Sequence, residues 1–176
     1  MKCNYTSTLL GAVVLFVWGM ASWSVLPWHM QTFTKFTNEP AVVTAMMEGG
    51  TERAMYMIPG EISHDSSQCN PKAPRAFIAF CPQGMTQSMP KMMGIAALTQ
   101  LLLAGFVGCL LSRTSGLSYW KKVCFVSEIG LVIGVASYVP MYNWFGFTCA
   151  YTVVGIVDTV IGFTLAGLVI AKFSKA

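Results

Sequence analysis

Four long runs of apolar residues divide this chain. They are Thr8–Leu26, Met92–Ser112, Val123–Val139 and Phe147–Ala171, and the only acidic or basic side chains within them are Glu128 and Asp158. Because the hydrocarbon core of a bilayer is about 30 Å thick, a helix that crosses it needs about 20 apolar residues. The runs approach or reach this length, so the pattern predicts four transmembrane helices.

The segment between the first two runs predicts a small cap outside the membrane. Asn38-Glu39-Pro40 is typical of a helix start with Asn38 as the N-cap, and Gly49-Gly50 predicts where that helix ends. Ala54–Ile58 and Ala76–Cys81 are predicted as two short strands, because each is apolar and bounded by turn residues. The cap is therefore expected to contain one helix and two strands.

These elements predict an all-α membrane fold, in which four transmembrane helices form an antiparallel bundle and a small α+β cap joins the first two. The predicted parts are residues 1–28 (the N-terminus and first helix), 29–91 (the outward cap) and 92–176 (three helices and a tail). Pro140–Gly146 is expected to be the turn before the last helix. The first helix could also be a cleaved signal peptide, but its apolar run continues to Leu26, which favours an uncleaved helix.

Charge predicts the orientation of the helices. The cap segment Trp28–Lys91 contains equal numbers of basic and acidic residues. All basic residues outside it lie on one predicted side of the membrane: Lys2, Arg113, Lys121, Lys122, Lys172 and Lys175. The positive-inside rule places this side in the cytoplasm, together with both termini. Since topology accounts for the basic loop, we expect no nucleic-acid partner. The expected partners are the lipid bilayer and a membrane protein or a second copy of the chain.

Small residues recur at a spacing of four along three of the predicted helices, where they allow helix backbones to approach closely in lipid. The pairs are Ala104 and Gly108, Gly130 and Gly134, and Gly162 and Ala166. They predict contacts within a compact bundle.

Asp158 is the sharpest candidate for a functional residue. It lies about ten residues from the outer end of its span, roughly 15 Å deep at 1.5 Å per residue. A carboxylate at that depth costs several kcal/mol unless it pairs, faces the bundle interior or takes up a proton. Gln100 lies at a similar depth and is its predicted hydrogen-bond partner. Two roles stay open, a structural link between helices, which we favour, and a proton or ion relay.

The second intramembrane acid, Glu128, is closer to the cytoplasmic border. It follows Lys122 by six residues. We therefore predict that its side chain extends toward that border and meets Lys121, Lys122 or Arg113.

Cysteine and methionine residues of the cap raise a further possibility. Cys69 and Cys81 are both within the outward segment, where oxidising conditions favour a disulfide. Met55 and Met57, with His29 and His64, supply soft and imidazole ligands of the kind that bind copper. Their spacing forms no compact site, so we predict no metal and no cofactor.

Two short motifs resemble those of a protein family. Leu26-Pro27-Trp28-His29 follows the first helix, and Asn143-Trp144-Phe145-Gly146-Phe147 precedes the last helix, which carries Asp158. Together with the order of elements along nearly the whole chain, they resemble a family of uncharacterised bacterial four-helix inner-membrane proteins. The resemblance implies a bacterial inner-membrane location and no particular activity.

The sequence thus favours a non-enzymatic membrane protein, either an accessory or assembly subunit or a binding module. A proton relay through Asp158 and copper or redox handling by the cap are the alternatives.

Overall fold

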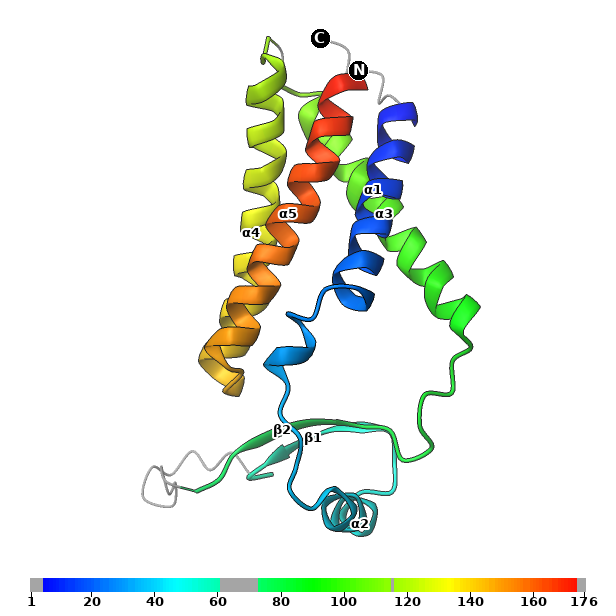
Figure 1. The fold of residues 1–176 in the computed structure, drawn as a ribbon, viewed down its shortest axis with the longest axis vertical. Coiled ribbons are helices and arrows are strands. Elements are labelled where there is room, and N and C mark those ends of the chain that lie inside the picture. Colours follow the sequence, from blue (N-terminus) through cyan, green and yellow to red (C-terminus); the bar gives the residue numbers. More distant parts are fainter. Residues whose placement is uncertain (1–4, 61–72, 115, 174–176) are drawn as a thin grey trace.

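The computed structural model describes residues 5–60, 73–114 and 116–173. In chain order its elements are α1 (Tyr5–Ser24), the short 3-10 helix η1 (Met30–Thr32), α2 (Glu39–Gly49), β1 (Ala54–Ile58), β2 (Ala76–Phe80), α3 (Met89–Leu111), α4 (Tyr119–Phe145) and α5 (Cys149–Phe173). Within the described residues, the four long helices are long and apolar enough to cross a membrane, as predicted. The start of α1 and the end of α5 lie at one end of the molecule, and the cap lies at the other (Figure 1).

The long helices pack side by side in the order α3, α1, α5, α4. Helix α3 packs along α1 and diverges from α4 toward the cap, so the bundle is more open there than the compact bundle that the sequence predicts (Figure 1). The buried core includes Ala104 of α3, Leu15 of α1, Val126 of α4, and Phe163 of α5. These side chains hold together all four long helices.

Small residues lie at the helix contacts. A Cβ atom added to Gly130 would be 2.6 Å from Cβ of Phe163, and one added to Gly134 would be 3.2 Å from Cα of Ile156. The backbones of α4 and α5 therefore approach too closely for larger side chains at these points. The remaining predicted packing residues also lie inside the bundle: Ala104 and Ala166 are fully buried, Gly108 faces Thr8, and Gly162 faces Trp18.

The predicted turn at Pro140–Gly146 is wrong in its position, because α4 continues through Pro140 to Phe145. Proline removes one backbone N–H bond from a helix, but transmembrane helices tolerate it where neighbouring groups compensate. The helix ends instead at Gly146, whose φ of 73° is in the left-handed region that glycine adopts readily.

The cap follows the predicted order. The Asn38 side chain accepts a hydrogen bond from the backbone N–H of Ala41 and caps α2, as predicted. Strands β1 and β2 form an antiparallel pair, which lies between the ends of the long helices and α2 (Figure 1). Cys81 is a half-buried free thiol, and its predicted disulfide partner Cys69 lies outside the described residues, so the disulfide stays a prediction.

Candidate functional site

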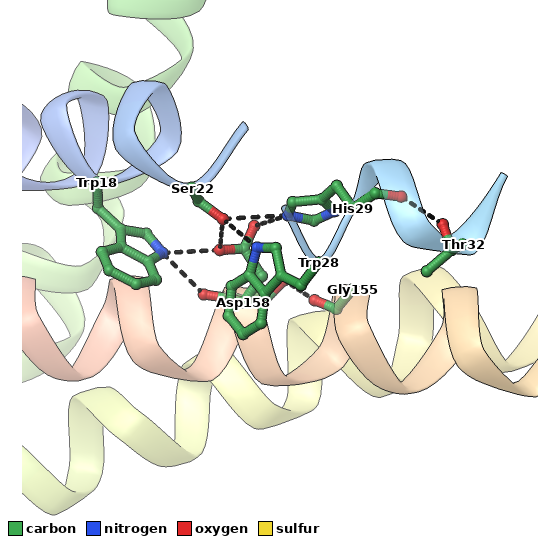
Figure 2. A network of polar contacts seen from close by, with 8 residues as sticks. Trp18, Ser22, Trp28, His29, Thr32, Gly155 and Asp158 are labelled. Atoms are coloured by element: carbon green, nitrogen blue, oxygen red, sulfur yellow. Dashed lines mark hydrogen bonds and ion pairs between the residues drawn. The ribbon is translucent and has the colours of Figure 1, made fainter. Parts of the chain in front are cut away.

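The carboxylate of Asp158 lies between α5 and α1, where it accepts hydrogen bonds from two side chains and lies within ion-pair distance of a third (Figure 2). Trp18 donates its indole N–H to Oδ1 at 2.8 Å, and Ser22 donates its hydroxyl to the same oxygen at 2.6 Å. His29 Nε2 is 3.3 Å from Oδ2. The His29 side chain is 4% exposed and that of Asp158 is 15% exposed, so the pair is largely enclosed by protein.

A second set of contacts holds the donors in place. The indole N–H of Trp28 donates to Ser22 Oγ at 3.0 Å. The Trp23 ring stacks on the imidazole of His29, with ring centres 4.0 Å apart and planes 7° from parallel. The Thr32 hydroxyl donates to the carbonyl of His29 at 2.7 Å and closes the turn at η1. The imidazole is therefore fixed by an aromatic face on one side and by hydrogen bonds at its edge.

Hydrogen counting favours the tautomer of His29 that carries its proton on Nε2. A serine hydroxyl has one proton to donate and can accept two hydrogen bonds. Because Ser22 donates to Asp158 and accepts from Trp28, the remaining lone pair of Ser22 Oγ can accept an N–H from His29 Nε2, which is 3.0 Å away. That N–H points at both Ser22 and Asp158. In that tautomer all three side-chain partners present hydrogen to the carboxylate.

Local sequence explains how these side chains converge. Trp18 and Ser22 are four residues apart in α1, so they lie on one face of that helix. A Cβ atom added to Gly162 would be 2.8 Å from the Trp18 ring, so this glycine leaves the space that the indole occupies beside α5. After α1, the chain turns and forms η1. This turn returns His29 toward Asp158 (Figure 2).

The contacts differ from those of a hydrolytic Ser-His-Asp triad. In such a triad the serine and the aspartate bind opposite nitrogens of the imidazole, so the histidine can take the serine proton while the aspartate orients the ring. Here Ser22 and Asp158 both approach Nε2 of His29. Ser22 is also fully buried, and its hydroxyl is already bound to the carboxylate. The arrangement suits holding two helices together or holding a proton, and it does not present a nucleophile.

The structure places the other predicted intramembrane polar residues differently. Gln100 on α3 is not among the partners of Asp158, because the face of α5 that carries this carboxylate packs against α1. Within the described residues Glu128 forms no ion pair with Lys121, Lys122 or Arg113, and its side chain is exposed on α4. Neither predicted pairing is formed among the residues that the structure describes.

The residues considered for copper are not brought together. His29 is buried beside Asp158, whereas Met55 and Met57 are exposed on β1 of the cap. His64 lies outside the described residues. In the described part of the chain, no group of three or more His, Cys, Asp or Glu side chains could hold a metal ion.

Sequence reasoning identified Asp158 and missed its partners. The sequence patterns did not point to Trp18 and Ser22, and they gave His29 a place at the end of the first helix and among the copper candidates, not beside Asp158. One signal was available: hydrogen-bonding side chains four residues apart in the same turn of the first span, followed by a histidine just after that span. Such donors on the cap-side half of one helix match an acid on the cap-side half of another.

The chain matches no known family model, no curated protein and no solved structure. The resemblance of Leu26–His29 and Asn143–Phe147 to a bacterial inner-membrane family therefore stays a prediction.

Proposed function

We propose that the protein is a non-enzymatic integral membrane protein, an accessory or assembly subunit or a binding module. In this proposal the network around Asp158 fastens α1, and the turn that leads to the cap, onto α5. The observation that carries it is that Trp18, Ser22 and His29 all direct donors to one carboxylate. A closed network of this kind fixes the position of a segment, and it leaves the carboxylate little capacity for a substrate.

Further support comes from the fact that the network joins α5 both to α1 and to the turn that follows α1. Trp18 and Ser22 are within α1, whereas His29 belongs to the turn beyond its end. Asp158 binds both, so the exit of α1 is held against the middle of α5. The cap that follows is then presented from a fixed point rather than from a free linker.

We also propose that the cap faces the outside of a bacterial inner membrane and that both termini are cytoplasmic, as the basic residues predict. A membrane-impermeant thiol reagent applied to intact cells after mild reduction should then label Cys81, which is partly exposed on the cap. Cys3 should stay unlabelled until the cells are opened. Labelling of Cys3 in intact cells, with Cys81 protected, would reverse the orientation.

A proton relay through Asp158 is the second candidate, and the position of His29 favours it. Histidine exchanges protons near neutral pH, and in membranes a buried acid with a histidine beside it is a common relay element. Against it, the only other acid in the described spans is Glu128, on the exposed surface of α4. A relay that crossed the whole membrane would need further proton carriers.

Proton flux in proteoliposomes separates the two functions. We expect the wild type, Asp158→Asn and His29→Gln to show the same pH-driven flux as protein-free liposomes, because the network is structural. The thermal stability of each variant is measured in parallel, so that misfolding is not mistaken for lost activity. Flux in the wild type that disappears in a stable Asp158→Asn protein would contradict the proposed function and establish the relay.

A further inference from the structure

The two faces of the β1–β2 hairpin are distinguished by its register. Met55 pairs with Ala79 and Met57 pairs with Phe77, and directly opposed side chains in an antiparallel pair share a face. These four side chains therefore form one face, which we call the methionine face. Because successive side chains of a strand point to opposite faces, Tyr56 and its partner Ile78 lie on the other face.

Ring contacts assign each face to a neighbour. Phe77 contacts Phe145 at the end of α4, with ring centres 4.7 Å apart, and Phe147 just before α5, at 6.5 Å. The methionine face is thus directed at the membrane-spanning helices. On the opposite face, the ring of Tyr56 lies within 2.9 Å of a Cβ atom built at Gly50, next to the end of α2. The hairpin is therefore a layer between the helix ends and α2 (Figure 1).

Most of the methionine face is not covered by protein. Met55 is 59% exposed and Met57 is 38% exposed, although both point to the side on which the helices lie. Every side chain of this face is apolar. Apolar surface of this kind marks a contact with a partner or a membrane.

From these contacts we infer that the methionine face binds the lipid surface of the outer leaflet, with Met55 and Met57 directed into the boundary between headgroups and acyl chains. The face is continuous with the surface of the spanning helices through Phe77 and Phe145. Trp144 and Tyr142, which precede Phe145, are also exposed, and exposed aromatic residues at a helix end are typical of a membrane interface.

The inference extends the proposed function, because it gives the cap a lipid partner. It does not depend on the role of Asp158. The hairpin lies beneath the helix ends, and α2 lies on the side that faces away from them (Figure 1). A bilayer around the four spans would meet the methionine face without any rearrangement of the cap.

Methionine oxidation in nanodiscs tests the inference with the native sequence. Met47 on α2 is a matched control, because it is the same residue type, is 48% exposed, and belongs to the helix on the far side of the hairpin. Without lipid, Met55 is more exposed than Met47, so a water-soluble oxidant should oxidise it at least as fast. With lipid on the methionine face, we expect a water-soluble oxidant to convert Met55 to its sulfoxide at least about threefold more slowly than Met47. Equal rates, or faster oxidation of Met55, would overturn the inference.

A photo-crosslinker identifies what covers the face. With p-benzoylphenylalanine in place of Met55, irradiation of the protein in phospholipid nanodiscs should yield phospholipid adducts in the mass spectrum. The same group in place of Met47 should yield few or none. Crosslinks between two copies of the chain, to another protein, or only to the chain's own helices would each replace lipid as the occupant and overturn the inference. Neither readout depends on proton flux, so the inference and the proposed function can fail separately.

Discussion

Replacing Asp158 with leucine is expected to lower the free energy of unfolding by about 3 kcal/mol, because several buried polar side chains are left without their hydrogen-bond acceptor. Trp18, Ser22 and His29 would all lose the acceptor that they share. A single average hydrogen bond between membrane helices contributes only about 0.6 kcal/mol. The larger expected loss reflects three donors that converge on one group. The loss in unfolding free energy is measured by unfolding the purified protein in mixtures of a mild and a denaturing detergent.

Two variants serve as controls for this loss. Asp158→Asn keeps the shape of the side chain and one oxygen for Trp18 and Ser22, so it should cost only about 1 kcal/mol. Val157→Leu introduces the same leucine at the neighbouring position, which is 39% exposed on the outer surface of the helix, and should change stability little. If Asp158→Leu were as stable as Val157→Leu, the network would not fasten α1 to α5.

Gly130→Ala is expected to destabilise the contact between α4 and α5 by about 2 kcal/mol, within the range for overpacked interiors. The added methyl group would be 2.6 Å from Cβ of Phe163 and 3.3 Å from the carbonyl oxygen of Thr159. Neither atom is the free end of a flexible side chain, so the helices themselves must separate. The change is measured as the shift in unfolding free energy relative to wild type.

Gly19→Ala is the matched control, because Gly19 is also inside a long helix and a Cβ atom there would meet nothing within 4 Å. Alanine has a higher helix propensity than glycine, so this variant should be neutral or slightly more stable. Equal effects of the two alanines would show that helix propensity, and not close packing, determines the response at Gly130.

The sequence by itself determined the class of the fold. Transfer of charged groups into lipid is so costly that the near absence of charge from four apolar runs suffices to predict the spans. Local rules were also enough for the cap, where Asn38 caps a helix and Ala54–Ile58 forms a strand. The exception is Pro140, because a transmembrane helix can continue through a proline where neighbouring groups compensate for the lost hydrogen bond.

The tertiary structure alone decided which polar groups meet. Gln100 was a plausible partner for Asp158 by depth, but depth along a helix does not say which face of the helix carries a residue toward which neighbour. The packing of α1 against α5 determines the partners of Asp158. Gly162 leaves room for Trp18, and the turn after Ser24 brings His29 back to the carboxylate. These contacts join residues more than a hundred positions apart, and side-chain shape across the interface determines them.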